Sequence, residues 1–307
     1  MQQEMDDSGE YFWEDSQMRP LRRRLEEVRK NTGLSWETIE RDYILSWVLA
    51  GTGVNEKLQK TLIFKGGTAL KKCYFGEYRF SEDLDFTARD SAPRQDELEK
   101  EINRSCRLAA ELAQNYSPLE LEVERYRERE PHPGNQEAFI IRGKFPWHRQ
   151  FLARVMIEIT VDEPIKIEPV RRRIIHGYGE DISQEVFVCS LEEIMAEKMR
   201  AILQHRQKLE ERGWSRSRAR DYYDLWRILN HYSERLRLEI LPSLFLKKCK
   251  VRRVKFGGPK EFFSKALLDY TAKTWEQWLG PLVPELPPFE IVINSLEQKL
   301  FDLFKRA

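Results

Sequence analysis

The sequence has no long hydrophobic stretch and almost no net charge. None of its apolar runs approaches the roughly 20 residues that a membrane-spanning helix needs. The opening segment, MQQEMDDSGEYFWED, is acidic and lacks the hydrophobic core of a signal peptide. Lysine and arginine number 52 against 51 aspartates and glutamates, so no overall attraction to nucleic acid is expected. We therefore expect a cytoplasmic protein without membrane contact, in which any polyanion binding depends on local charge.

Cysteine is scarce and dispersed. The 4 cysteines are Cys73, Cys106, Cys189 and Cys249, with no CxxC pair among them. Disulfide scaffolds and zinc sites need closer or paired spacings. The pattern predicts reduced thiols and excludes both classes.

The chain does contain enough apolar sequence for one large domain or two lobes. Its 307 residues are 41% apolar and 34% charged, which is typical of a globular protein with a polar surface. We predict a flexible acidic tail over 1–18, a mixed helix and strand region over 19–189, and a helical lobe over 190–307. The fold class is therefore α+β.

Hydrophobic periodicity and capping residues predict the individual elements. A helix begins near Pro20 and ends at Gly33, and Ser35 begins a second helix that Gly51–Gly53 should stop. A later helix begins at Ser190, where Glu193 would complete a capping box. The remaining predicted elements are a helix over 95–115, strands over 119–123, 138–145, 150–161 and 186–189, and a last helix over 295–304.

The stretch LIFKGGTALKKCYFGEYRFSEDLDFT, residues 62–87, carries the strongest chemical pattern. An apolar run is followed by a Gly-Gly turn and a segment compatible with a helix. Backbone N–H groups at such a turn form an anion site. We predict that Gly66, Gly67 and Thr68 hold the phosphates of a nucleotide, and that Lys65 and Lys71 assist. The alternative for both lysines is simple exposure to solvent.

Two acids follow in the same stretch. Asp83 and Asp85 are separated by one residue, so in a strand their side chains share one face. Close carboxylates repel each other unless a cation neutralises them, and Mg²⁺ commonly binds one or two carboxylates together with substrate phosphates. We predict that both aspartates bind Mg²⁺ (or Mn²⁺), with a nucleoside triphosphate as substrate and Ser81 among its contacts. Two solvated acids after a turn are the alternative.

A third acid lies in a predicted strand further along the chain. Glu158 alternates with Val155, Ile157 and Ile159, so it occupies the opposite face of a largely apolar strand. A buried carboxylate is costly without a partner. Glu158 is therefore predicted to be a third metal ligand, and a solvated sheet face is the alternative.

The helical half adds a lysine and an acid. Lys198 falls within the apolar stripe that includes Met195 and Ile202, so its ammonium must either extend to solvent or meet an anion in a cleft. Asp221 borders the apolar stripe of a later helix. Asp224 falls nearly opposite and is predicted to form a surface ion pair with flanking arginines. We therefore assign Lys198 and Asp221 to the cleft.

Two segments are rich in basic residues. Residues 198–220 contain eight lysines and arginines against two glutamates, and residues 247–255 contain six cations and no acid. Such segments favour polyanions, although each alone could be an ordinary basic face. Beside a nucleotide site they favour an RNA acceptor.

The motifs KGGTALKK and RFSEDLDF resemble the AbiEii/AbiGii-like and MenT-type nucleotidyltransferase toxins of the DNA polymerase beta-like superfamily. The similarity is tight over 64–86 and weaker as far as 229. It implies a polymerase beta-like nucleotidyltransferase core. It also matches Lys198 to the lysine of the family's EKxxA motif and Asp221 to the first acid of its RxxDxYD motif. Where Glu158 stands, the family usually has aspartate.

The resemblance further implies a toxin of a bacterial toxin–antitoxin or abortive-infection system that acts in phage defence. Such an enzyme transfers a nucleoside monophosphate to RNA, with the 3′ end of tRNA as the expected acceptor, and a cognate antitoxin is encoded nearby. Two alternatives stay open. One is a phosphotransferase that modifies a protein or a nucleotide, and the other is a non-catalytic module that binds nucleotide or RNA. A Walker A kinase is disfavoured because GGTALKK lacks the GxxxxGK[ST] spacing.

Overall fold

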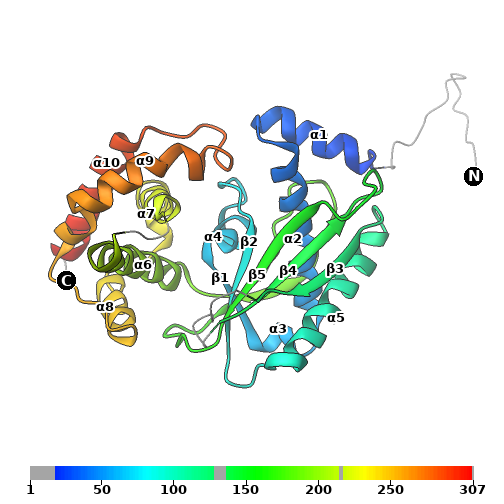
Figure 1. Ribbon diagram of the computed structural model, residues 1–307, viewed down its shortest axis with the longest axis horizontal. Coiled ribbons are helices and arrows are strands. Elements are labelled where there is room, and N and C mark those ends of the chain that lie inside the picture. The colour runs from blue at the N-terminus through cyan, green and yellow to red at the C-terminus, as the bar shows by residue number, and fades with distance from the viewer. Residues whose placement is uncertain (1–17, 128–135, 214–216, 306–307) are drawn as a thin grey trace, which may run out of the picture.

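A mixed seven-stranded sheet forms the centre of the molecule (Figure 1). The computed structural model describes residues 18–127, 136–213 and 217–305, so nearly all of the predicted tail lies outside the described residues. The strand order is β3-β4-β5-β2-β1-β7-β6. The strands are β1 (Leu62–Lys65), β2 (Asp83–Ala88), β3 (Glu120–Arg125), β4 (Gln136–Lys144), β5 (Ala153–Thr160), β6 (Val170–Arg173) and β7 (Glu185–Val188). The predicted α+β class is confirmed.

The two strands of the glycine and aspartate motifs are neighbours at the middle of the sheet. Strand β1 pairs antiparallel with β2, and the connection between them contains a helical turn, α4 (Gly66–Ala69), that continues into a π-helical segment, η1 (Leu70–Phe75). Strand β2 pairs parallel with β5, and β1 pairs parallel with β7. This order brings the predicted Glu158 strand directly beside the aspartate strand.

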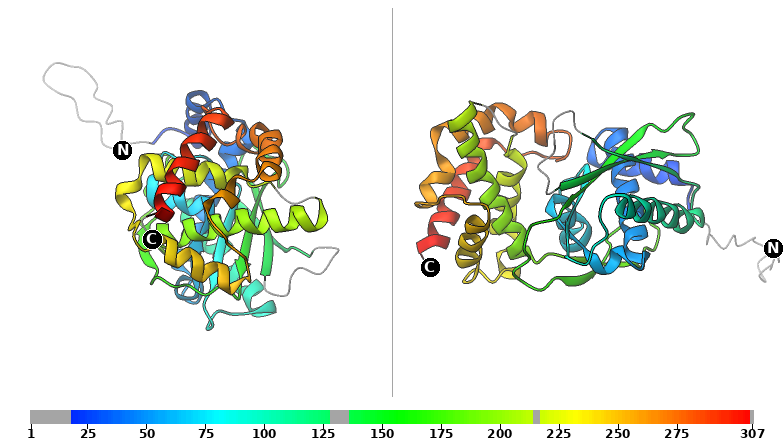
Figure 2. Two further views of the ribbon diagram at one scale, coloured as in Figure 1. Left: turned by 90° about the vertical axis from the view of Figure 1, so that its left-hand side faces the viewer. Right: turned by 60° about the horizontal axis from the view of Figure 1, so that its bottom comes forward.

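Helices of the N-terminal lobe, defined as the described residues as far as β7, cover the sheet (Figures 1 and 2). Ser35 begins α2 as predicted, because its hydroxyl accepts the Thr38 N–H at 3.1 Å. Helix α2 ends at Val54, one residue after the stop predicted over Gly51–Gly53. A Cβ at Gly51 would collide with the Ser105 carbonyl on α5, so this glycine permits close helix packing. The helices are α1 (Leu21–Thr32), α2 (Trp36–Val54), α3 (Leu58–Thr61) and α5 (Gln95–Gln114).

The C-terminal lobe consists of helices that gather beside the sheet (Figure 2). They are α6 (Leu191–Arg212), α7 (Ala219–His231), η2 (Ser233–Arg235), α8 (Leu241–Val251), η3 (Pro259–Phe263), α9 (Lys265–Leu279) and α10 (Phe289–Lys305). Ser190 caps α6 through the Glu193 N–H at 3.2 Å, but the Glu193 carboxylate turns away and accepts the Ile167 N–H at 2.8 Å. The predicted capping box is thus only half formed. Helix α10 also begins earlier than the expected 295–304.

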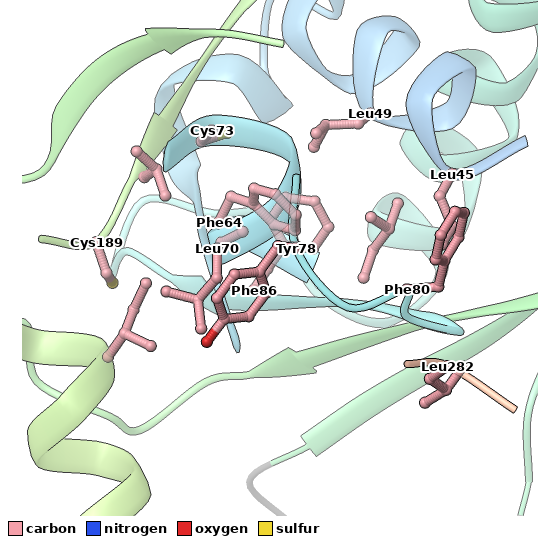
Figure 3. Packing of buried hydrophobic residues seen from close by; sticks show 14 of the residues in the cluster. Leu45, Leu49, Phe64, Leu70, Cys73, Tyr78, Phe80, Phe86, Cys189 and Leu282 are labelled. Carbon is pink, nitrogen blue, oxygen red and sulfur yellow. The ribbon is translucent and has the colours of Figure 1, made fainter. Parts of the chain in front are cut away.

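Buried side chains join the two lobes beneath the central strands (Figure 3). The Phe64 and Phe86 rings lie 5.3 Å apart between centroids. The Phe80 N–H donates to the carbonyl of Leu282, from the C-terminal lobe, at 2.9 Å.

The cysteines are buried free thiols, as predicted. Within the described ranges, no helix has the length and hydrophobicity to span a bilayer.

Candidate active site

The sheet register places three charged side chains in one row. Asp85 on β2 lies directly opposite Lys65 on β1 and Glu158 on β5. Residues paired across neighbouring strands project from the same face. Asp83, two positions before Asp85, projects from that face as well. The predicted placement of the Glu158 strand beside the aspartate strand is therefore confirmed.

Asp85 has the most perturbed electrostatic environment of the row. Its burial raises the pKa of the carboxyl well above the ordinary range, and the nearby charges of Asp83 and Glu158 raise it further. Lys65 and Lys198 act in the opposite direction but do not compensate. A cation would relieve this repulsion. Among the described residues, no three acidic, histidine or cysteine side chains converge as a formed metal site, so the three-carboxylate ligand set stays a prediction.

Lys65 connects the three acids of the site, Asp83, Asp85 and Glu158, which we call the acid row, to the C-terminal lobe. Its buried ammonium donates to Glu197 Oε2 on α6 at 3.2 Å. Burial alone would raise the pKa of Glu197, but Lys65 and Lys248 outweigh it and lower the pKa to about 2. The alternative of an exposed lysine is thus wrong for Lys65. Its ammonium is held by a carboxylate from the other lobe.

The Gly-Gly turn fits closely against the site. Gly66 has a φ of 77°, and a Cβ there would collide with the Asp85 carboxylate. A Cβ at Gly67 would collide with the Arg79 guanidinium. The Thr68 hydroxyl donates to the Asp83 carbonyl at 2.5 Å, so it fixes the strand and leaves backbone N–H groups as the donors for a ligand. The turn thus brings the backbone of Gly66 against the carboxylate of Asp85.

The structure separates the other two predicted nucleotide contacts. Ser81 is buried, and its hydroxyl accepts from Arg79 Nη1 at 3.2 Å next to the Gly67 turn. The Lys71 ammonium donates to the Gly76 carbonyl at 3.3 Å and lies 4.0 Å from the centroid of the Phe80 ring. Neither of these Lys71 contacts is with the acid row. Ser81 therefore lies beside the Gly67 turn, whereas Lys71 contacts Gly76 and Phe80 instead.

Lys198 meets two acids of α7, and one of them was wrongly assigned. Its Nζ lies 2.9 Å from Asp221 Oδ1 and 2.8 Å from Asp224 Oδ2. Asp224 is fully buried and is not a surface ion-pair residue. The predicted partner Arg220 instead donates to Glu82. The Lys198 ammonium does not extend to solvent, since both aspartates hold it, and its contact with a triphosphate stays a prediction.

Arg79 is the site residue that sequence reasoning missed. Its Nε and Nη2 donate to the two oxygens of Asp224, each at 2.7 Å. Burial would raise the pKa of Asp224, but Arg79 and Lys198 lower it to about 2. Arg79 is the first residue of the RFSEDLDF motif, and its place in that motif was the only sequence feature that could have indicated a role in the site. Its partner lies 145 residues away in the sequence, which no local pattern indicates.

Comparisons with known proteins agree with this architecture. A family model described as "Nucleotidyl transferase AbiEii toxin, Type IV TA system" matches residues 47–301. Among solved structures, MenT4, the nucleotidyltransferase toxin Rv2826c from Mycobacterium tuberculosis H37Rv, is similar with a TM-score of 0.60 and 18% sequence identity. That similarity covers 92% of this chain and 88% of MenT4, and it concerns the fold. A comparison with curated protein sequences finds no significant match.

Paired strand aspartates beside a Gly-Gly turn, on a mixed sheet with a helical lobe, define a nucleotidyltransferase. The chain belongs to the AbiEii nucleotidyltransferase toxin family of type IV toxin–antitoxin systems. The family resemblance inferred from KGGTALKK and RFSEDLDF is thereby confirmed. A toxin of this class is paired with a cognate antitoxin.

Proposed function

We propose that the chain transfers a nucleoside monophosphate from a nucleoside triphosphate to the 3′ hydroxyl of an RNA, with tRNA as the acceptor. The observation that carries the proposal is the row of Lys65, Asp85 and Glu158 across three adjacent strands, with Asp83 beside it and Lys198 near enough to act on Asp85. The 3′ oxygen forms a bond to the α-phosphorus. The bond from that phosphorus to the bridging oxygen breaks, and pyrophosphate leaves.

Asp83 and Asp85 would hold Mg²⁺ or Mn²⁺ in this proposal, and Glu158 would complete the set. Oxygen donors suit these hard cations, and Mg²⁺ usually takes its remaining ligands from substrate phosphates and water. Burial first, and then the charges of Asp83 and Glu158, raise the pKa of Asp85, so a bound cation would stabilise its ionised form. When bound, the cation would stabilise the negative charge that develops on the transferred and leaving phosphates.

The other residues would bind and orient the triphosphate. The Gly66 backbone packs closely against the Asp85 carboxylate, and the backbone N–H groups of the Gly66–Gly67 turn would bind phosphate oxygens. An ammonium has three donors, and Asp221 and Asp224 engage two directions of Lys198. Its remaining N–H would contact phosphate, so the two aspartates position Lys198 for that contact.

Labelled nucleotides test the reaction type. The protein is incubated with total cellular RNA, Mg²⁺ and each nucleoside triphosphate, labelled at either the α- or the γ-phosphate. Transfer of the α label to RNA of tRNA size is expected, with loss of more than about 100-fold in Asp85→Asn. Incorporation of the γ label alone would instead establish a phosphotransferase.

The metal assignment has its own test. Glu158→Gln should keep the fold and raise the Mg²⁺ concentration needed for half-maximal transfer by about tenfold. Glu122→Gln, on edge strand β3, is the control, because β4 separates its strand from β5. An unchanged Mg²⁺ requirement in Glu158→Gln would remove this residue from the ligand set.

We also propose that this activity operates in the cytoplasm as an abortive response to phage. Membership of a type IV toxin family supports this proposal. Induction of the chain without its antitoxin should arrest bacterial growth, and Asp85→Asn should relieve the arrest. Full toxicity of Asp85→Asn would favour a non-catalytic binding module.

A further inference from the structure

Glu82, which directly precedes the first site aspartate, is held between arginines of the two lobes. Its Oε1 accepts from Arg41 Nη1 on α2 at 3.0 Å, and its Oε2 accepts from Arg220 Nη2 on α7. One carboxylate thus bridges two guanidinium groups at the edge of the acid row. The side chains of Arg41, Arg220 and Glu82 are 23%, 24% and 36% exposed, so solvent reaches all three.

The two guanidinium groups keep donor capacity that Glu82 does not use. Glu82 accepts from only one Nη of each arginine. The other carboxylate on Arg41 is Glu37, whose side chain is 63% exposed. A guanidinium offers five donors in a rigid fork that matches phosphate oxygens. The pair can therefore bind an anion with more acceptor oxygens than the Glu82 carboxylate has.

An exposed indole lies beside this pair. The Arg220 guanidinium is 5.4 Å from the centroid of the Trp278 ring, and Trp278 is 40% exposed. Nucleic-acid sites for single strands combine cationic side chains for phosphate with aromatic rings on which bases stack. Arg220 also ends the basic segment 198–220. Arg41, Arg220 and Trp278 together form what we call the rim clamp.

We propose that the rim clamp binds the acceptor strand: a phosphodiester near its 3′ end displaces Glu82 from Arg41 and Arg220, and an adjacent base stacks on Trp278. The proposal rests on the RNA transfer function above and specifies where the acceptor lies. Glu82 occupies the phosphate position in the free protein. Glu82 directly precedes β2, so a phosphate in its place would lie near the start of the strand that carries Asp83 and Asp85.

The alternative anion is the triphosphate of the nucleotide. The Gly66 backbone lies against Asp85, and Lys198 is close enough to lower the pKa of Asp85, so these groups suit the triphosphate better. The rim clamp lies at the Ser81–Asp83 connection and includes an aromatic ring that a triphosphate does not need. Charge and position therefore favour the acceptor strand over the nucleotide.

Binding without catalysis tests the rim clamp directly. The full chain, without metal or nucleotide, is titrated into a fluorescent single-stranded RNA of about 12 nucleotides with a free 3′ hydroxyl. Arg41→Gln and Arg220→Gln should each raise the Kd about tenfold and lower the salt slope by about 0.7. Arg125→Gln, at an ion-paired and similarly half-buried arginine of edge strand β3, should change neither. If the rim variants bind as Arg125→Gln does, the proposal is wrong.

Glu82 gives a test of opposite sign. If it occupies the phosphate position, Glu82→Gln should lower the Kd for the RNA about threefold, and the gain should vanish in Glu82→Gln/Arg220→Gln. A merely structural bridge predicts no gain or weaker binding, which would overturn the displacement.

Trp278→Ala should raise the Kd about tenfold and Trp278→Phe should restore it. Should Arg41→Gln unfold, Arg41→Lys keeps the charge without the fork and should bind at an intermediate Kd.

Steady-state kinetics separate this proposal from the reaction itself. Arg220→Gln should raise the KM for RNA about tenfold and leave the KM for the nucleotide unchanged. A rise in the nucleotide KM alone would assign the arginines to the triphosphate and overturn the proposal. If the wild type transfers no label but the RNA affinities change as predicted, the rim clamp is supported and the transfer function fails.

Discussion

Arg79 and Asp224 form a bidentate ion pair, with both N–O distances at 2.7 Å, in a place from which solvent is excluded. Arg79 comes from the connection that leads into β2, and Asp224 comes from α7. Through Asp224 the pair also fixes Lys198, whose Nζ lies 2.8 Å from the same carboxylate. The strand motif and the helical motif are therefore joined by a buried charge contact.

Removal of Arg79 should affect stability and activity together. Arg79→Gln leaves Asp224 with Lys198 as its main cation, and breaking a buried pair costs about 3–5 kcal/mol. Urea unfolding should show that loss, and kcat should fall because Lys198 is drawn toward the uncompensated acid. Arg29→Gln is the matched control, since Arg29 makes a similar bidentate pair with Glu26 at the surface. A stability change as small as that of the control would contradict the prediction.

Gly66 should be required for both backbone conformation and the position of Asp85. Gly66→Ala places a methyl group against the Asp85 carboxylate and also strains a φ of 77°. Gly213, at the end of α6, has a φ of 75° with open space around its Cα. Gly66→Ala and the control Gly213→Ala should each lose about 1 kcal/mol of unfolding free energy from backbone strain. Only Gly66→Ala should also lose nucleotide transfer, which the labelled RNA assay measures.

Lys248 should be a structural lysine, although it lies in a segment predicted to bind polyanions. Its buried ammonium lies 2.5 Å from Glu193, 3.0 Å from Glu197 and 3.3 Å from Glu163. Lys248→Met leaves these acids without their shared cation, so a loss of about 3–5 kcal/mol is expected. Lys247→Met, at the exposed neighbouring position, should alter stability little. Equal chemical denaturation midpoints for the two variants would refute this assignment.

His205 should make the fold sensitive to mild acid. The ring is buried, neither nitrogen has a hydrogen-bond partner among the described residues, and burial lowers its pKa to about 4. Because the folded pKa lies below the unfolded value near 6.5, stability is full above that pH and falls as the pH drops toward 4. Between pH 7.5 and 5 the loss is about 2 kcal/mol. His205→Leu should make the free energy of unfolding depend less on pH between 7.5 and 5. An unchanged dependence on pH would count against this role of His205.

The local pattern was sufficient for much of the site. Alternation places Asp83 and Asp85 on one face, and the apolar stripe leaves Lys198 either to extend to solvent or to meet an anion, of which the structure shows the second. Both inferences depend on residues a few positions apart, where periodicity is informative. The strand order that brings Glu158 opposite Asp85 was also anticipated, because a polar side chain on a buried strand needs a partner.

The errors involve partners that are distant in sequence. Asp224 was assigned to the surface because its helix neighbours include Arg220, and only the fold shows that Arg79 fills that position. Lys248 was counted as a free cation. Each error arose where tertiary contact outweighed local propensity.

The buried ion pairs that cross between the lobes also limit how the molecule can move. Lys65 with Glu197 and Arg79 with Asp224 each tie the sheet to a helix of the other lobe, and opening either would expose a charge pair that burial now fixes. Hinge motion between the lobes should therefore be small, and nucleotide should bind without a large change in their relative position. Heating should accordingly unfold both lobes in one cooperative transition, which calorimetry can detect as a single peak whose van't Hoff and calorimetric enthalpies agree.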